Sequence, residues 1–270
     1  MKLKDKVALV TGTSPNIGGG IAEGLAAEGA ALVCVDAMAA NATDCANYLK
    51  STGAQALAVT CDVTAEAEVA AAVQKACDTF GRIDVLVNNA VVFNKKGVLT
   101  MPLEDWRRQI DVILTGAFLF TKHAARSMID RQVRGSILNI ISTAGHQGEP
   151  NNIGYSTAKS GLINFTRSAA MELVKHGIRV NSLTPTATDP SESAERAQRW
   201  GRAAPDLSAV KPIFEMYRSR IPMQKLPKPS DYGRAAAFIV STEAEMMTGT
   251  DLRIDAGAIA RYWPWDPAAS

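Results

Sequence analysis

The fold is decided by Lys6-Val-Ala-Leu-Val-Thr11 and by the turn that follows it, Gly12-Thr-Ser-Pro-Asn-Ile-Gly18-Gly19-Gly20. The first six residues are mostly apolar or β-branched and predict a buried strand that runs straight into a glycine-rich turn. A helical pattern follows, with Ile21, Leu25 and Ala26 on one side. This order brings backbone N–H groups and a helix N-terminus to a pyrophosphate, so the stretch predicts a dinucleotide site.

A second predicted strand, Ala31-Leu-Val-Cys-Val-Asp36, ends in an acid that indicates which dinucleotide binds. At the end of such a strand, a carboxylate can accept hydrogen bonds from the adenosine ribose hydroxyls. Asp36 would repel a 2′-phosphate, and neither Ala37 nor the turn Thr13-Ser14-Pro15 offers an Arg or Lys to bind one. These residues therefore predict NAD rather than NADP.

Strand and helix patterns alternate along the rest of the chain. Further strands are predicted at 56–62, 83–90, 135–142, 178–183 and 252–255, and helices at 65–80, 103–131 and 153–176. This alternation predicts the α/β class, as a Rossmann-type doubly wound parallel sheet with helices on both faces. Ligands bind beyond the carboxyl ends of such strands. No composition shift marks a linker, so we expect residues 1–270 to form a single domain.

Ser142, Tyr155 and Lys159 predict a proton-transfer site. Tyr155 and Lys159 lie four residues apart on a predicted helix and project from the same face. A phenol titrates near ~10 in water and is a poor base at neutral pH unless a positive charge stabilises the phenolate. We expect Lys159 to lower the phenol pKa in this way. Ser142 ends the apolar run Ile137-Leu-Asn-Ile-Ile141, where its hydroxyl can hold a substrate oxygen.

Taken together, these motifs resemble the short-chain dehydrogenase/reductase family, in its single-domain NAD-dependent subgroup. The resemblance runs from Lys6 to Gly257. Its elements are, in chain order, Thr11-Gly12 with Ile17-Gly18, Asp36, Cys61-Asp62-Val63, Asn88-Asn89-Ala90, Ser142, Tyr155 with Lys159, Arg179-Val180-Asn181 and Asp255. The family implies that Tyr155 acts as acid and base and that Ser142 polarises the carbonyl or alcohol oxygen.

The resemblance also implies a cofactor site. Asp62 would contact the adenine amino group, Asn89 and Ala90 would line the adenosine side, and Lys159 would hydrogen-bond the nicotinamide ribose. The full implied set is Gly12, Ser14, Asn16, Ile17, Gly18, Asp36, Asp62, Val63, Asn89, Ala90, Tyr155, Lys159, Pro185 and Thr188. The family further implies dimers or tetramers.

Several positions depart from the family pattern. Asn16 replaces the middle glycine of the turn, and we expect it to adopt the left-handed conformation that asparagine tolerates. Val91 and Thr186 replace glycines beside the nicotinamide position and add bulk there. Pro190 replaces a threonine that bonds the carboxamide, which leaves Thr188 and Ser191 as substitutes.

Ile113 is the departure with the greatest chemical consequence. The family usually has an asparagine there, which helps to hold a water that relays protons to the lysine. An isoleucine side chain cannot do this. Either the backbone carbonyl holds the water, or the relay runs differently, or the reaction is slower.

Composition excludes several classes of function. The 270 residues are 47% hydrophobic and carry a net charge of +2, without the basic runs that suggest nucleic acid. Neither an N-terminal signal region nor a membrane-length apolar run is visible, so we expect a cytoplasmic protein. The four cysteines lack C-x-x-C spacing and are expected to be buried apolar residues. With three histidines, the chain shows no zinc ligand set.

Substrate specificity is expected from the least regular parts of the chain. The excursion at about 188–229 reads as two helical pieces broken near Pro205, and it can act as a lid or pack against a neighbouring subunit. His146 is a candidate substrate contact. The C-terminal tail, 258–270, is unusually aromatic from Tyr262 to Trp265 and can cover an active site or anchor a subunit contact.

The sequence thus predicts an NAD-dependent oxidoreductase that interconverts a secondary alcohol and a ketone, with Tyr155 as acid and base. Ser142, His146 and Tyr155 are the predicted substrate contacts, and the substrate is expected to be an uncharged small molecule. Reduction of an acyl-thioester ketone is the alternative reaction. A non-catalytic NAD-binding sensor or scaffold is the alternative of another class, although the intact Ser142, Tyr155 and Lys159 argue against it. A homo-oligomer, tetramer or dimer, is expected.

Overall fold

The computed structural model describes residues 1–203 and 205–261, and a sheet of seven parallel strands lies at its centre. The strands are β1 (Val7–Thr11), β2 (Ala31–Asp36), β3 (Ala56–Thr60), β4 (Val85–Asn88), β5 (Ser136–Ile140), β6 (Arg179–Pro185) and β7 (Asp251–Ile254). They are ordered β3-β2-β1-β4-β5-β6-β7, so the sheet grows outward in both directions from β1 and β4. This order confirms the doubly wound Rossmann-type sheet.

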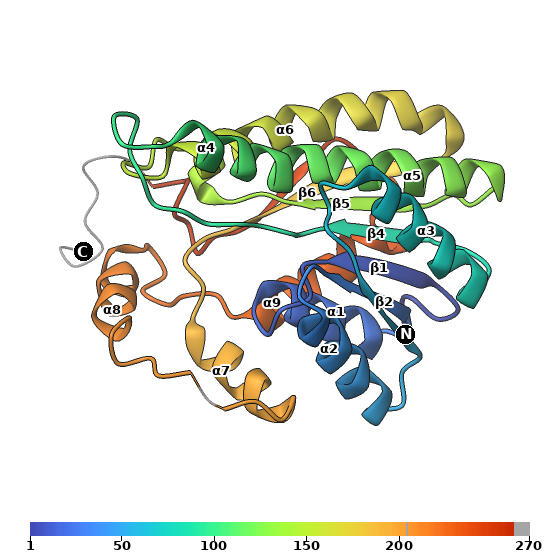
Figure 1. The fold of residues 1–270 in the computed structure, drawn as a ribbon, viewed down its shortest axis with the longest axis horizontal. Coiled ribbons are helices and arrows are strands. Elements are labelled where there is room, and N and C mark those ends of the chain that lie inside the picture. The colour runs from blue at the N-terminus through green and yellow to red at the C-terminus, as the bar shows by residue number, and fades with distance from the viewer. Residues whose placement is uncertain (204, 262–270) are drawn as a thin grey trace.

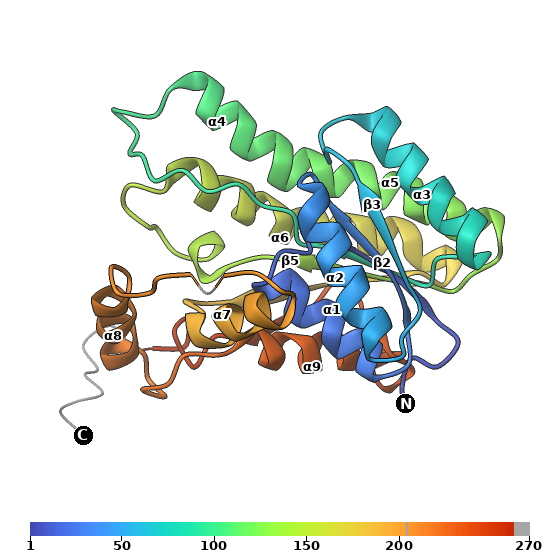
Figure 2. The same cartoon turned by 60° about the horizontal axis from the view of Figure 1, so that its bottom comes forward.

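Helices cover both faces of the sheet (Figure 1). One face carries α3 (Glu66–Phe80), α4 (Leu103–Ile110), α5 (Gly116–Asp130) and α6 (Ile153–Leu173), and the other carries α1 (Ile17–Ala27), α2 (Ala39–Ser51) and α9 (Pro229–Val240). The excursion forms α7 (Pro190–Arg199) and α8 (Lys211–Arg220), which Figures 1 and 2 show to one side of these layers. Its two predicted helical pieces are confirmed.

The core lies on both faces of the strands, because parallel strands are covered by helices on each side. Along β1, Val7 and Leu9 face the layer of α3, α5 and α6. Ala8 and Val10 face the layer of α1, α2 and α9. The near-continuous apolar character of these strands in the sequence follows from this double burial.

The structure differs from the sequence prediction in its helices. The predicted helix 103–131 is interrupted by a π-helical turn at Asp111–Thr115. Helices α2 and α9 were not assigned from the sequence. In α2 the buried residues are mainly alanine, cysteine and asparagine, so its apolar stripe is weak. The aromatic residues Tyr262 to Trp265 lie outside the described part of the chain.

The apolar stripe on the helix that carries Tyr155 packs within the chain. Leu162 and Ala169 are buried, and Phe165 packs against the same core clusters. This stripe therefore packs within the chain and gives no evidence for or against a partner. Within the described ranges, every helix falls short of the length and apolar character needed to cross a bilayer.

Candidate active site

The end of strand β5 brings Ser142 close to helix α6, which carries Tyr155 and Lys159. Ser142 follows β5 in extended backbone, and its hydroxyl accepts a hydrogen bond from Ala144 N at 3.2 Å. This bond starts a 3-10 turn at Thr143–Gly145, which packs directly on α6. A Cβ on Gly145 would lie 2.9 Å from the backbone carbon of Lys159, so only glycine allows this approach.

Lys159 is buried, and among the residues that the structure describes no carboxylate forms an ion pair with it. Its side chain is 3% exposed, and Nζ donates a hydrogen bond of 2.6 Å to the Ile140 carbonyl. Burial lowers the pKa of Lys159 to about 7. Nζ lies 5.7 Å from the centre of the Tyr155 ring. The structure thus brings the two predicted partners together, and it leaves the lysine poised to gain or lose a proton near neutral pH.

The phenol of Tyr155 does not have the lowered pKa that the sequence predicted. Burial raises the pKa of Tyr155, a hydrogen bond with Ser142 opposes this rise, and the charge of Glu149 adds to it. The net direction is upward. The physical reason is that loss of water around the ring outweighs stabilisation of the phenolate. At neutral pH the ring therefore keeps its proton in this structure.

Phe93 packs against the Tyr155 ring and was not predicted from the sequence. Its ring meets that of Tyr155 edge-on, with centroids 5.1 Å apart and an angle of 83°. Lys95 Nζ lies 5.5 Å from the centre of the Phe93 ring. Phe93 is itself 55% exposed. The only signal in the sequence is its position just after Asn89-Ala90, where the strand end predicts ligand contacts.

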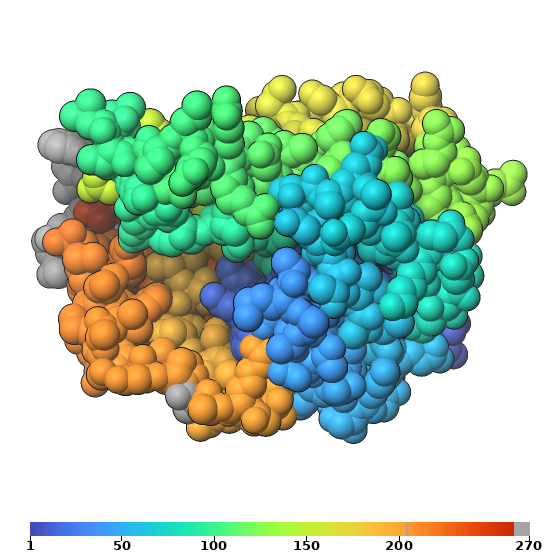
Figure 3. Space-filling view, viewed as in Figure 1, coloured from blue at the N-terminus to red at the C-terminus, as the bar shows by residue number. Residues whose placement is uncertain are grey.

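Figure 3 shows a surface recess between the green segment that precedes α4, the orange α8 and the blue glycine-rich turn. Val91 and Phe93, which follow β4, are both about half exposed, and Phe93 contacts Tyr155. Exposed apolar side chains beside Tyr155 suit a substrate with apolar surface.

The glycine-rich turn has the close packing that a pyrophosphate cradle needs. Gly12 has φ of +72°, and a Cβ on Gly18 would lie 2.0 Å from the Gly12 carbonyl oxygen. Asn89 Nδ2 donates to the carbonyls of Thr11 and Gly12, at 3.1 and 2.9 Å, and so fixes the turn against β4. The residues present fit a dinucleotide, because any side chain at Gly18 would fill the turn.

Asn16 does not adopt the left-handed backbone conformation that the sequence predicted, so this prediction was wrong. Asn16 has φ of −94° and ψ of −136°, outside the left-handed region. It stands at the N-terminus of α1 and is exposed, and its Oδ1 accepts a hydrogen bond from Ser193 Oγ at 3.1 Å. The turn therefore needs no glycine at this position. Ser14 and Ile17, the other predicted cofactor residues of the turn, are partly buried.

The adenosine side is built from the ends of β2 and β3. Asp36 is 9% exposed, and its Oδ1 accepts from Met38 N at 2.9 Å and from Asn41 Nδ2 at 3.2 Å. Asp62 Oδ1 accepts from Thr64 N and Oγ1, and its Oδ2 lies 3.4 Å from Arg108 Nη1.

The surroundings of Asp62 favour its charged form. Burial tends to raise the pKa of Asp62, but the hydrogen bonds from Thr64 and the charge of Arg108 outweigh burial and lower it. Val63, next to Asp62, is buried in the core. The predicted residues at the ends of β2 and β3 are thus in place.

Hydrogen bonds hold the segment that follows β6. The Thr188 hydroxyl donates to the Thr186 carbonyl at 3.1 Å and lies 3.1 Å from the Tyr232 hydroxyl. Asp189 caps α7 by accepting from Ser191 N at 3.0 Å, with Pro190 in the first turn of that helix. Both proposed substitutes for the missing threonine already have partners.

His146 is held by side chains of β6 and β7. Its Nε2 lies 3.1 Å from Thr184 Oγ1 and 3.2 Å from Asp251 Oδ2. Asp251 also accepts from Ser182 Oγ at 2.8 Å. The imidazole therefore already has polar partners in the fold, and its contact with substrate stays a prediction. The sequence could not show these partners, because Asp251 is more than a hundred residues away.

Ile113 sits at the centre of the π-helical turn. It is 2% exposed and packs with Ala117, Ile141, Ala158 and Leu162. A cavity of about 10 Å³, lined by residues that include Ile113 and Lys159, lies beneath the site. Its volume is at the lower limit for one water. A π-helical turn breaks the regular α-helical hydrogen bonding, so it is the backbone here that can offer polar groups.

The sequence predicted neither disulfides nor a zinc site. Cys34, Cys45, Cys61 and Cys77 are buried free thiols, as expected. Across residues 1–203 and 205–261, His, Cys, Asp and Glu side chains form no group of three that could hold a metal ion.

Comparisons with known proteins agree with this geometry. The family model described as Enoyl-(Acyl carrier protein) reductase matches residues 12–258. The cis-4-hydroxycyclohexanecarboxylate dehydrogenase of Sinomonas cyclohexanicum is 38% identical over 95% of this chain and 97% of its own length. A short-chain type dehydrogenase/reductase from Mycobacterium marinum superposes with a TM-score of 0.86 at 29% identity, over 96% of this chain and 98% of the other. An NAD⁺-bound xylitol dehydrogenase superposes with a TM-score of 0.84 at 31% identity, over 94% and 99%.

Proposed function

The chain belongs to the short-chain dehydrogenase/reductase family, and we propose that it is an NAD-dependent oxidoreductase that interconverts a secondary alcohol and a ketone. The observation that carries the proposal is the grouping of Ser142, Tyr155 and Lys159 at the carboxyl end of β5, in a sheet whose glycine-rich turn fits a dinucleotide. The non-catalytic alternative has less support, because a buried lysine beside a phenol serves no evident structural purpose.

The residues that would hold NAD lie along the carboxyl edge of the sheet. The turn from Gly12 to Gly18 would receive the pyrophosphate, and Asp36 would accept hydrogen bonds from the adenosine ribose. Asp62 and Asn89 would line the adenosine side, and Lys159 would contact the nicotinamide ribose. A bound NAD would supply the hydride acceptor for alcohol oxidation, and NADH would supply the hydride donor for ketone reduction.

The protein's own groups move the proton. In ketone reduction, Tyr155 donates its phenolic proton to the substrate oxygen while Ser142 holds that oxygen by a hydrogen bond. The raised pKa of Tyr155 suits this acid role. In alcohol oxidation, Tyr155 must first lose its proton, and a protonated Lys159 favours the phenolate. Burial lowers the pKa of Lys159 to about 7, so the lysine carries this charge at and below about neutral pH.

The substrate proposed for this site is a secondary alcohol on a ring. The exposed apolar side chains of Val91 and Phe93 border the site, and the Phe93 ring stands against Tyr155. The relative from Sinomonas cyclohexanicum is named for a hydroxycyclohexane substrate. Reduction of an acyl-thioester ketone is the second candidate, because a relative from Synechocystis sp. that is 36% identical over 95% of this chain is named 3-oxoacyl-[acyl-carrier-protein] reductase.

A spectrophotometric screen tests this proposal. Cyclic secondary alcohols, linear diols and sugar alcohols are each incubated with NAD or NADP, and absorbance of the reduced cofactor is followed. Faster turnover of cyclic alcohols with NAD than with NADP is expected. Preferential reduction of a 3-oxoacyl thioester would favour the second candidate. Tight NAD binding with no turnover of any alcohol, ketone or thioester would favour the sensor.

Self-assembly and location complete the proposal. Phe118 on α5, Met171 on α6 and Val174 just after it are between 48% and 63% exposed, and large apolar side chains on neighbouring helices are costly to leave in water. We propose that these helices pair in a homo-oligomer, a tetramer or dimer, which light scattering can test. The protein is proposed to act in the cytoplasm.

A further inference from the structure

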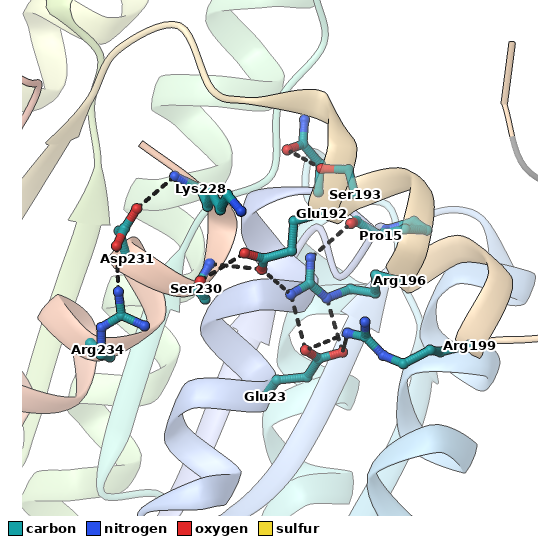
Figure 4. Close-up of polar contacts among 11 residues, drawn as sticks. Pro15, Glu23, Glu192, Ser193, Arg196, Arg199, Lys228, Ser230, Asp231 and Arg234 are labelled. Carbon is teal, nitrogen blue, oxygen red and sulfur yellow. Dashed lines mark hydrogen bonds and ion pairs between the residues drawn. The ribbon is translucent and has the colours of Figure 1, made fainter. Parts of the chain in front are cut away.

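Helix α7 is docked on the half of the molecule that binds the nucleotide. Arg196 is 1% exposed, and its Nε lies 2.9 Å from Glu23 of α1, while Nη2 lies 2.7 Å from Glu192. Nη1 donates to the Pro15 carbonyl in the glycine-rich turn, at 3.2 Å. Glu192 also accepts from Ser230 N and Oγ at the start of α9. As Figure 4 shows, this cluster joins α7 to α1, α9 and the turn.

The turn that follows α7 delivers an arginine to the adenosine side. Trp200 is buried and packs so close to Gly19 that a Cβ there would lie 3.0 Å from its ring. Arg202 lies over the Trp200 ring, 5.7 Å from its centre. Its Nε donates to Asp44 Oδ2 at 2.7 Å, and its Nη1 donates to Asn41 Oδ1 at 2.8 Å. Arg202 is 161 residues away from Asn41 in the chain.

A single buried amide joins Arg202 to Asp36. Asn41 accepts from Arg202 with Oδ1 and donates to Asp36 Oδ1 with Nδ2, at 3.2 Å. A cation bound to the amide oxygen turns the amide nitrogen toward the carboxylate. Without that cation, the amide could rotate and present its oxygen to Asp36, which would repel the carboxylate. Both hydrogen bonds to Asp36 fall on Oδ1, which leaves Oδ2 to accept ribose hydroxyls.

We propose that Arg202 is a positioning residue for the adenosine ribose, acting through Asn41 to hold the Asp36 carboxylate. The proposal rests on the proposed use of NAD. It adds that the excursion takes part in cofactor recognition, because Arg202 belongs to the excursion and contacts Asn41 and Asp44 of α2. This role could not be predicted from the sequence, since basic partners for the ribose site are sought beside Asp36 and in the glycine-rich turn.

The test compares ADP with 2′,3′-dideoxyadenosine diphosphate, which lacks the ribose hydroxyls. Calorimetry measures the dissociation constants of both for the wild-type protein, Arg202→Met, Asn41→Ala and Arg199→Met. Arg199 is the matched control, because it lies in the same segment and contacts Glu23 and not Asn41. The wild-type protein is expected to bind ADP about tenfold more tightly than the dideoxy analogue, as one charge-assisted hydrogen bond gives.

The ratio of the two dissociation constants decides the question. Arg202→Met and Asn41→Ala should both lower it to about threefold, and the double variant should match the single ones, while Arg199→Met keeps the wild-type ratio. An unchanged ratio in Arg202→Met would overturn the proposal, as would an equal loss in Arg199→Met, which would assign the effect to docking of α7 in general. Thermal unfolding of each variant shows whether it is folded. If the wild-type protein binds neither ADP nor NAD, the proposed cofactor fails instead.

Discussion

The region around α6 and the region around α7 each contain a buried basic side chain, but the two side chains have different hydrogen-bond partners. Lys159 on α6 has a backbone carbonyl as its hydrogen-bond acceptor, and burial lowers its pKa to about 7. Burial also acts to lower the pKa of Arg196 on α7, but Glu23 and Glu192 outweigh it and raise that pKa. A cation that is paired with carboxylates stays charged and stabilises the structure. A buried cation without such a partner can change its charge during a reaction.

The comparison predicts that the two regions respond differently to substitution. Changes around α6 should lower activity while the fold survives, because we propose that its groups act on the substrate. Changes around α7 should lower stability and cofactor affinity, because its charged groups pair with each other.

The largest effect is expected for Tyr155→Phe. The variant keeps the ring and its contact with Phe93 but has no proton to exchange. Turnover should fall by about 10²–10⁴-fold, as for other lost acid/base groups. NAD affinity, measured by calorimetry, should change little. Wild-type turnover in the variant would remove Tyr155 from the mechanism.

A smaller effect, on stability, is expected for Arg196→Met. Removing one partner of a buried ion pair leaves charge uncompensated, which typically costs about 3–5 kcal/mol. Glu23 is 20% exposed and keeps Arg199, and Glu192 keeps Ser230, so we expect about 2 kcal/mol here. Denaturant unfolding measures the loss, with the more exposed Arg199→Met as the control at below about 1 kcal/mol. Equal losses in the two variants would show that burial of Arg196 contributes nothing.

The same two regions show how much can be predicted from the sequence. Ser142 follows a strand, and Tyr155 and Lys159 lie on one helix, so their juxtaposition follows from helical spacing and from the rule that ligands bind at strand ends. The glycine-rich turn and Asp36 were readable for the same reason. These local patterns were enough to predict the fold class and the juxtaposition of Ser142, Tyr155 and Lys159.

Contacts between distant segments were not readable. Nothing in the spacing of Arg196 and Arg202 predicts their partners on α1 and α2, because ion pairs between distant segments leave no periodic signal. The raised pKa of Tyr155 was also missed, since it depends on how much water the fold removes from the ring. From residue spacing alone, the charge of Lys159 was expected to dominate the pKa of Tyr155, because spacing does not show how deeply the phenol is buried.

The pH dependence of stability should reveal Lys159 in the cofactor-free protein. Its pKa is about 7 when folded and 10.5 ordinarily, so between these values the unfolded chain binds a proton that the folded chain does not. Stability must therefore rise with pH in this window, by at most about 1.4 kcal/mol per pH unit. Lys159→Met should lack this rise, so the stability of the wild-type protein relative to the variant should increase from pH 7 to 9.

Denaturant unfolding at several pH values measures this difference. The exposed Lys175 supplies the control, because Lys175→Met should run parallel to the wild-type protein. Parallel curves for Lys159→Met as well would mean that Lys159 keeps its ordinary pKa in the folded protein. The contrast between Lys159, which has no carboxylate partner, and Arg196, which has two, would then be lost.

The smallest effect on turnover is expected for Ile113→Asn, which restores the family's usual residue in the π-helical turn. If the backbone of Asp111–Thr115 already serves the proton path near Lys159, the new amide adds a redundant polar group and turnover should stay similar or rise. Ile113→Val is the control for volume, since it removes one methyl group and adds no polar atom. Steady-state kinetics and denaturant unfolding of both variants separate chemistry from packing. A fall in turnover of more than about tenfold in Ile113→Asn, with Ile113→Val unaffected, would mean that this site depends on an apolar wall beneath Lys159, because a polar group there would favour the charged form of the lysine.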